Sequence, residues 1–255
     1  MDKLPVSVMM VVRNEAARIS RCLGSVGWAD EIVIIDQSSD DNTVELCRRY
    51  TDKVFTVAAK GYCEPDRLLA LSKAVNEWVL YLDADEVVSD ALRQRIAALL
   101  GGRPQFDRYY IARKNIFLGR WIKGSGWSPG YVLRFFKKSG VAFSERIHTD
   151  VIALGPCGYI SEPIEHYTCE DLEEYLAKAN RYSSILARQA YAAGARVRGM
   201  NVPLKAGIEP VAMAARKYFL QCGFRDGWQG AVIACLTALT IFMRNVKVWE
   251  MGRMK

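Results

Sequence analysis

The stretch Trp78-Val-Leu-Tyr-Leu-Asp-Ala-Asp-Glu86 sets a short apolar run directly before three carboxylates. A run of this length and composition is typical of a strand that is buried on both faces of a parallel sheet. Asp83 and Asp85 follow it, two residues apart, where the chain leaves the strand for a loop. Open α/β sheets bind their ligands beyond this end of their strands. The stretch therefore predicts a buried strand and a ligand site at its carboxyl end.

Three more apolar runs precede this one and alternate with stretches of helical spacing. The predicted strands cover Val6–Val12, Ile32–Ile35, Val54–Val57 and Trp78–Leu82. The predicted helices cover Ala16–Val26, Asp40–Tyr50, Leu68–Val75 and Ser89–Leu100. Strand–helix–strand repetition at this spacing indicates right-handed βαβ units. We therefore predict an α/β fold, with a mostly parallel sheet flanked by helices.

The pattern changes after Gly101-Gly102-Arg103-Pro104. Two further strands are predicted at residues 108–117 and 131–137, separated by a loop rich in glycine and tryptophan. Helical spacing then covers residues 171–193, 203–224 and 228–249. We therefore predict a catalytic domain over residues 1–168 and a helical C-terminal extension over residues 169–255.

Charge is distributed unevenly along the 255 residues, which carry a net charge of +7. Residues 178–255 hold 13 basic and 3 acidic side chains, whereas residues 1–177 have a net charge of −3. A basic region suggests contact with an anionic surface. Nucleic acid is not expected as a partner, because the basic residues are scattered on helices without base-stacking aromatics.

The apolar stretch Gly230–Met243 is shorter than the about 20 residues that a membrane-spanning helix needs. A helix packed on the domain, or one lying at a membrane interface, is therefore favoured.

Cysteine usage and the first residues bear on the compartment. The seven cysteines include no C-x-x-C pair, and the first residues do not resemble a secretory signal. We expect reduced thiols in a cytoplasmic protein.

The carboxylates after the strands suggest metal and nucleotide chemistry. Asp83 and Asp85 offer the oxygen ligands that Mg²⁺ or Mn²⁺ prefers, and such an ion can bridge a diphosphate. Asp36 ends the second predicted strand and can accept a hydrogen bond from a base or ribose. The first strand is followed by Arg13-Asn14-Glu15 and not by a glycine-rich dinucleotide motif, and the chain contains no P-loop motif.

The order of several motifs resembles glycosyltransferase family 2, and within it the bacterial lipopolysaccharide-core β-glucosyltransferase-like branch. The motifs are V-R-N-E (12–15), D-Q-S-S-D-D-N-T (36–43), K-G-Y (60–62), W-V-L-Y-L-D-A-D-E (78–86), R-K-N-I-F-L-G-R-W-I (113–122), G-W-S-P-G-Y-V-L-R-F-F (126–136), H-Y (166–167) and D-L-E-E-Y-L-A-K-A-N-R-Y-S (171–183). The similarity runs from about Val6 to Glu250.

The resemblance implies a GT-A fold and an inverting, metal-dependent transfer of a hexose. The expected donor is a UDP-sugar, and the expected acceptor is a lipid-linked glycan at the inner face of the cytoplasmic membrane. By the same resemblance, Arg13 and Glu15 line the nucleoside pocket and Asp36 reads the base. Arg67 and Arg134 are basic residues of the donor site, Asp83 lies near ribose and metal, and Asp85 binds the metal.

The chain also departs from this branch. Gly130 stands where an acidic residue is usual, and His148-Thr149-Asp150 replaces a His-Glu pair. For the general base we therefore place Asp150 first and Glu145 second. His148 is a candidate third metal ligand, whereas His166 is expected to serve packing or to support the ligands.

Two other functions stay open at this point. One is a catalytically altered, glycosyltransferase-like protein that binds nucleotides. The other is a sugar-phosphate nucleotidyltransferase, although that class normally carries a glycine-rich basic loop after its first strand.

Overall fold

The computed structural model describes residues 3–60, 62–143, 151–169 and 171–253. The chain forms two compact units: one holds residues 1–114 and 130–166, and the other holds residues 115–129 and 167–255. Whether a boundary at residue 168 separates independent domains stays a prediction. The two units are described in turn below.

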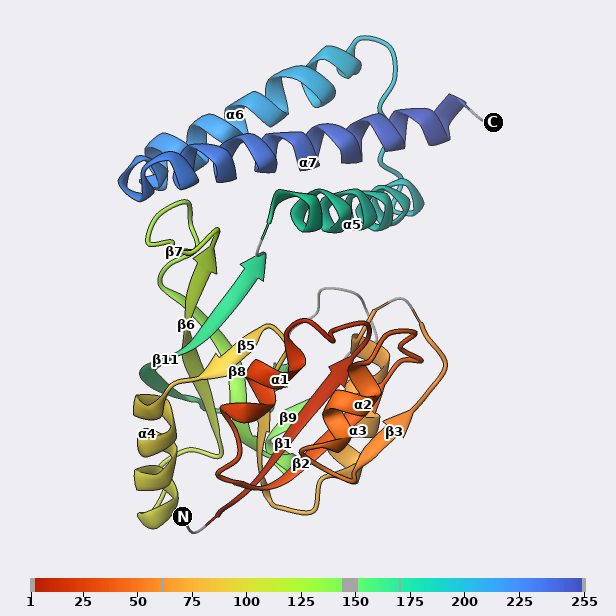
Figure 1. Cartoon of the computed structure of the whole chain (residues 1–255). Coiled ribbons are helices and arrows are strands. Elements are labelled where there is room, and N and C mark those ends of the chain that lie inside the picture. The colour runs from red at the N-terminus through yellow and green to blue at the C-terminus, as the bar shows by residue number, and fades with distance from the viewer. Residues whose placement is uncertain (1–2, 61, 144–150, 170, 254–255) are drawn as a thin grey trace. The chain divides into compact units, whose positions relative to one another are not determined.

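Four parallel strands form the first half of the sheet in the first unit (Figure 1). Their order is β3 (Val54–Thr56), β2 (Ala29–Asp36), β1 (Leu4–Val12) and β4 (Trp78–Tyr81). Val12 lies opposite Asp36, and Met9 lies opposite Tyr81. The carboxyl ends of β2, β1 and β4 therefore meet at one edge of the sheet, which is where the candidate site lies.

Both faces of this parallel half are buried, as the unbroken apolar runs predict. Successive residues of β1 enter different cores: Val8 and Met10 belong to one apolar cluster, while Met9 and Val11 belong to another. The alternation follows from the period of two in a strand. The covering helices are α1 (Ile19–Gly24), α2 (Thr43–Arg48), α3 (Arg67–Lys73) and α4 (Asp90–Gly101).

The sheet continues beyond β4 with antiparallel strands in the order β8 (Gly130–Lys137), β6 (Arg108–Phe117), β11 (Gly158–Cys169) and β5 (Glu86–Val88). The sequence predicts β6 and β8 but neither β11 nor β5. The strand β5 has three residues, and β11 contains Pro163 together with several polar residues. Neither has the apolar pattern that identifies a strand. A separate ribbon pairs β9 (Val141–Ala142) with β10 (Ile152–Ala153).

The second unit is mainly helical. Its helices are α5 (Leu172–Ala192), α6 (Glu209–Ala215), which π-helical turns extend at both ends over residues 203–220, and α7 (Trp228–Arg253). Both α5 and α6 pack against α7 (Figure 1). The short strand β7 (Arg120–Trp121) pairs with the end of β6. The three predicted C-terminal helices are thus observed, and α7 is longer than predicted. Together with the sheet, they confirm the α/β class and its C-terminal helical extension.

Of the described residues, one helix is long and apolar enough to cross a membrane. It is α7, with a mean hydropathy of 1.6 and 28% of its most apolar window buried.

Candidate active site

The loops after β1 and β2 hold each other in place. Asn14 and Ser38 both adopt positive φ angles, 55° and 52°. The backbone N–H of Asn14 donates to Ser39 Oγ at 2.9 Å, and the N–H of Asp40 donates back to Asn14 Oδ1 at 3.0 Å. Asparagine and serine are tolerated in this left-handed region when local hydrogen bonds support it. These contacts shape one wall of the site without any ligand.

Asp36, Arg13 and Glu15 lie at this edge of the sheet, as predicted. The Asp36 carboxylate is buried and accepts hydrogen bonds from the backbone N–H of Ser39, at 3.1 Å, and from its hydroxyl, at 2.5 Å. Arg13 is exposed, and Glu15 forms an ion pair with Arg18 at 3.6 Å. The sheet therefore brings the three residues to one region, while their predicted contacts to a nucleoside stay untested.

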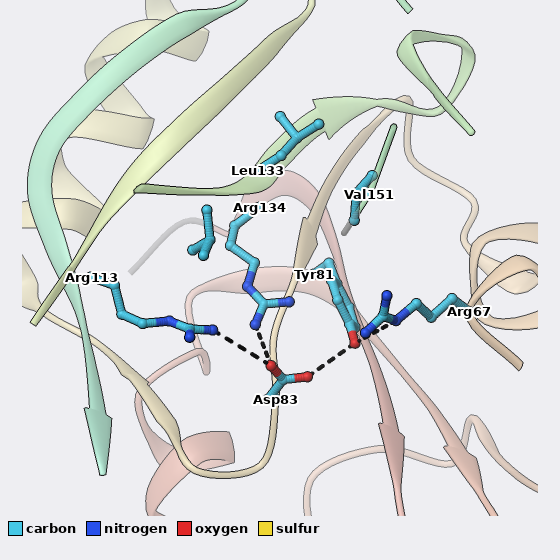
Figure 2. Close-up of a pocket in the computed structure, with 8 residues that line it drawn as sticks. Arg67, Tyr81, Asp83, Arg113, Leu133, Arg134 and Val151 are labelled. Carbon is cyan, nitrogen blue, oxygen red and sulfur yellow. Dashed lines mark hydrogen bonds and ion pairs between the residues drawn. The ribbon is translucent and has the colours of Figure 1, made fainter. Parts of the chain in front are cut away.

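Basic side chains converge on Asp83, directly after β4 (Figure 2). Its carboxylate forms ion pairs with Arg134 of β8 and with Arg113 of β6, the latter at 3.9 Å. It also accepts a hydrogen bond from the Tyr81 hydroxyl at 3.0 Å, and Tyr81 Oη in turn accepts one from Arg67 Nε at 3.0 Å. These residues line a hollow of about 110 Å³. Two guanidinium groups thus contact the Asp83 carboxylate, and a third reaches it through the Tyr81 hydroxyl.

The buried side chain of Glu86 orients the arginines of this cluster. One of its oxygens accepts hydrogen bonds from Arg113 at 2.8 Å and Arg134 at 2.9 Å, and the other accepts the backbone N–H of Asp83 at 3.0 Å. Glu86 is fully buried. Its side chain forms ion pairs with both of these arginines. Paired and hydrogen-bonded in this way, a buried carboxylate fixes both guanidinium groups.

The charges in the cluster shift the pKa values of its members. Burial by itself would raise the pKa of Asp83, but the charges of Arg134, Arg113 and Arg67 outweigh it and hold that pKa well below its usual range. Burial, followed by the charge of Asp83, raises the pKa of the Tyr81 hydroxyl. Asp83 is therefore ionised and Tyr81 protonated at neutral pH. Glu64, whose Oε1 lies 3.7 Å from Arg67 Nη2, is the third carboxylate of the cluster beside Asp83 and Glu86.

Asp85 lies beside His166 rather than beside the arginines. His166 Nε2 is 3.4 Å from Asp85 Oδ2, and both side chains are largely buried. His166 lies on β11, opposite Glu86 of β5, so the pairing of these strands delivers it to the Asp-x-Asp loop. A carboxylate oxygen and an imidazole nitrogen at this separation fit two adjacent positions around one divalent ion. Among the described residues, no group of three or more His, Cys, Asp or Glu side chains lies close enough together to hold a metal ion.

Three predicted residues fall outside the described part of the chain. These are Glu145 and Asp150, the candidates for the general base, and His148, the candidate metal ligand. Gly130, where the resembling branch has an acidic residue, is the first residue of β8.

The sequence analysis did not select Tyr81, Glu86 or Arg113, and it gave His166 a supporting role. Glu86 directly follows the Asp-x-Asp motif, so its position was a usable signal. Arg113 and His166 lie on strands far from the motif in sequence. Only the pairing of β6 with β8 and of β11 with β5 brings them to it.

Solved structures share this fold over nearly the whole chain. The structure of S. aureus TarS (residues 1–349) in complex with UDP-GlcNAc aligns with a TM-score of 0.51 at 15% identity, and the alignment covers 100% of this chain and 92% of TarS 1–349. The mannosyltransferase PcManGT of Pyrobaculum calidifontis, in complex with GDP-Man and Mn²⁺, has a TM-score of 0.51 at 17% identity, with coverages of 96% and 87%. The predicted GT-A fold is thereby confirmed.

The sequence comparison is more specific. The model of the family "Glycosyl transferase family 2" matches residues 7–154, more than half of the chain. The chain therefore belongs to glycosyltransferase family 2, and it is a glycosyltransferase.

Relatives of similar length agree with this assignment. The lipopolysaccharide core biosynthesis glycosyltransferase LpsC of Rhizobium meliloti is 28% identical over 95% of this chain and 94% of its own length. An uncharacterized glycosyltransferase of Rickettsia felis is 27% identical, with coverages of 96% and 89%.

Proposed function

We propose that the protein transfers a hexose from a UDP-sugar to a lipid-linked glycan of the cell envelope, with inversion at the anomeric carbon and with a divalent cation. The observation that carries the proposal is the group of three arginines around Asp83, next to the Asp85–His166 pair, at the carboxyl edge of a parallel sheet. The similarity to LpsC supports a lipopolysaccharide-core type of acceptor.

The arginine cluster suits the leaving group of such a reaction. A nucleoside diphosphate gains negative charge as its bond to the sugar breaks, and preorganised guanidinium groups stabilise that charge. Arg134 and Arg113 are already oriented by Glu86, so little reorganisation is needed when the diphosphate arrives. The exposed part of Asp83, about 37% of its side chain, leaves the cluster accessible to a ligand.

Asp85 and His166 are the residues that would hold the cation, and a bound Mg²⁺ or Mn²⁺ would neutralise the two phosphates of the donor. Asp83 would then face the ribose from its place between the arginines. Arg13, Glu15 and Asp36 would surround the nucleoside, as the family resemblance implies.

The acceptor hydroxyl would attack the anomeric carbon from the side opposite the diphosphate, in a single displacement. Its proton needs a carboxylate base, for which Asp150 and then Glu145 are proposed. The bond to the sugar forms as the bond to the diphosphate oxygen breaks, and UDP leaves with the electron pair. No enzyme nucleophile is required, in contrast to retaining glycosidases.

Release of UDP tests this proposal directly. The probes are UDP-glucose, UDP-galactose and UDP-N-acetylglucosamine with Mn²⁺, each with and without deacylated lipopolysaccharide core oligosaccharide as acceptor. Wild type should release UDP and extend the acceptor from one donor, and Asp85→Asn should lower the rate about 10²- to 10³-fold, as loss of a charge-stabilising group does. Glu45→Gln, an exposed acid of α2, is the matched control.

Two results would contradict the proposal. An Asp85→Asn variant with wild-type rates would exclude the assigned metal ligand. Binding of UDP without turnover of any donor would instead indicate a catalytically altered, nucleotide-binding protein.

A further inference from the structure

The hairpin of α6 and α7 has its polar residues on the inside. Glu209 of α6 forms ion pairs with Arg244 of α7 at 2.9 Å and with Lys205 at 3.2 Å. Asn245 of α7 is buried, and its amide donates to the carbonyl of Lys205 at 2.5 Å and to Glu209 at 3.4 Å. A polar network thus joins the two helices where a soluble helix pair usually has apolar side chains.

The outer face of the same hairpin is apolar. Leu204, Ile208, Val211 and Phe219 recur at helical spacing, and each has 51–68% of its surface exposed. Ala212 and Ala215 are exposed on the same stripe. The tip of the hairpin adds three large apolar side chains that are 49–79% exposed: Leu220, Phe224 and Trp228. A contiguous face of this kind marks an interaction surface rather than scattered surface residues.

The charge next to this face indicates what covers it. At the tip, Arg120, Lys123 and Arg225 line a hollow of about 490 Å³ together with Trp121 and one acid, the buried Asp226, whose carboxylate accepts the backbone N–H of Lys123 and Gly124. Lys123 Nζ lies 4.4 Å from the centre of the Trp121 ring, and Trp121 is itself exposed. Basic residues and tryptophan beside an apolar face are typical of protein surfaces that meet phospholipid head groups.

We infer that the hairpin lies in the surface layer of an anionic phospholipid bilayer, with the apolar stripe of residues 204–219 among the acyl chains and the basic tip among the phosphates. The stripe lies along one continuous helical segment, residues 203–220, which suits a helix lying in the plane of the membrane. In the stretch Gly230–Met243, for which the sequence leaves a packed and an interfacial helix open, Ile233, Ala234 and Leu236 are buried within the unit, whereas Leu239 and Phe242 are exposed. The inference rests on the lipid-linked acceptor of the proposed function and specifies the surface that would meet the membrane.

Vesicle flotation of the full chain tests the apolar stripe. The probes are vesicles of phosphatidylcholine alone and vesicles that also contain phosphatidylglycerol. Wild type should bind the mixed vesicles, and Ile208→Ser/Val211→Ser/Phe219→Ser should bind at least about tenfold more weakly, because the apolar area that enters the bilayer is lost. Val75→Ser/Ile152→Ser/Leu154→Ser is the matched control, since these three residues are also exposed and apolar but lie in the first unit.

A second variant tests the basic tip. Arg120→Gln/Lys123→Gln/Arg225→Gln should lower affinity for the mixed vesicles about fivefold per residue and reduce the preference over phosphatidylcholine. The inference would be overturned if the serine variant bound the vesicles as tightly as the wild type, or if the wild type did not bind mixed vesicles. A wild-type dimer without lipid that the serine variant converts to monomer would also overturn it, because the face would then belong to a second copy.

Release of UDP from the UDP-sugars named above separates this inference from the proposed reaction. The serine variant should retain the wild-type rate in the absence of vesicles, which also shows that it is folded. If the wild type bound vesicles but turned over none of the donors, the membrane-binding surface would be supported and the proposed reaction rejected.

Discussion

Arg134 is the residue whose surroundings are most constrained. It is buried, contacts both Asp83 and Glu86, and its Cζ lies 4.4 Å from the centre of the Tyr81 ring. Burial would lower its pKa, but the charges of Asp83 and Glu86 outweigh it and raise that pKa, so the guanidinium is permanently charged. Its Nη2 donates to both carboxylates, while the planar guanidinium lies over the Tyr81 ring, a stacking that a lysine ammonium does not reproduce.

We expect Arg134→Lys to lower kcat for transfer about 10²- to 10³-fold, because charge remains but the fork that would meet the diphosphate is lost. Steady-state kinetics with the accepted UDP-sugar measure this. Arg95→Lys, on the outer helix α4, is the control. Unchanged kcat in Arg134→Lys would mean that this arginine does not touch the leaving group.

Glu31 is a buried acid near the amino end of β2, the end of the strand opposite the site. It accepts hydrogen bonds from the hydroxyl of Ser7, the side chain of Lys53 and the backbone N–H of Val75. Burial would raise its pKa, but the bonds from Lys53, Ser7 and Val75 outweigh burial and lower it. The carboxylate thus joins β1, β2 and the residues before β4.

Glu31→Gln should destabilise the protein by about 1–3 kcal/mol at neutral pH. The pKa of Glu31 in the folded state lies below its value of about 4.3 in the unfolded state. The Glu31 charge therefore contributes fully to stability above about pH 4.3, and this contribution is lost as the pH falls through the folded-state pKa. Urea unfolding at several pH values should therefore show the gap between wild type and variant narrowing below about pH 4.3. A gap that stays constant with pH would contradict the role of the Glu31 charge; Glu45→Gln is the exposed control.

At the scale of elements, the short strand β5 and its partner β11 shape the side of the site that holds Asp85 and His166. Val87 and Val88 pair with Glu165 and Ile164, and the same register sets His166 opposite Glu86. The hydroxyl of Ser89, the cap of α4, donates to the carbonyl of Pro163 at 3.1 Å and reinforces this pairing. A three-residue strand thereby determines the place of an imidazole 80 residues further along the chain.

His166→Ala should weaken cation-dependent activity about 10- to 100-fold if the imidazole binds or orients the ion. His166→Gln, which keeps a polar group of similar reach, should recover part of the loss. Because Mg²⁺ demands oxygen ligands more strictly than Mn²⁺, wild type should respond better to Mn²⁺ and the variant should lose that preference. Titration of activity with each ion measures both effects; equal responses in wild type and variant would exclude His166 as a ligand.

For the whole molecule, ligand binding should appear as added stability. A ligand that binds only the folded chain stabilises it by about 2.7 kcal/mol at a concentration one hundred times Kd. UDP with Mn²⁺ should therefore raise Tm, and EDTA should reverse the rise. A panel of nucleoside diphosphates identifies the base, and Asp85→Ala should abolish the dependence on Mn²⁺. A shift for UDP that persists unchanged in EDTA would argue against a metal-bridged diphosphate.

The sequence by itself determined the α/β class, the parallel strands and the position of Asp83 and Asp85. These depend on local patterns: apolar runs form buried strands, and the residue after each run must lie at the carboxyl edge. The helices of the second unit follow from local periodicity in the same way.

Only the tertiary structure decided which side chains lie next to Asp83 and Asp85. The approach of Arg113 and Glu86 to Arg134, and of His166 to Asp85, depends on which antiparallel strands pair and in which register. Strand pairing joins residues distant in the chain, and β11 lacks an apolar pattern that would reveal it. The apolar outer face of α6 is also a tertiary fact, because periodicity shows that a helix has an apolar side but not whether that side is buried.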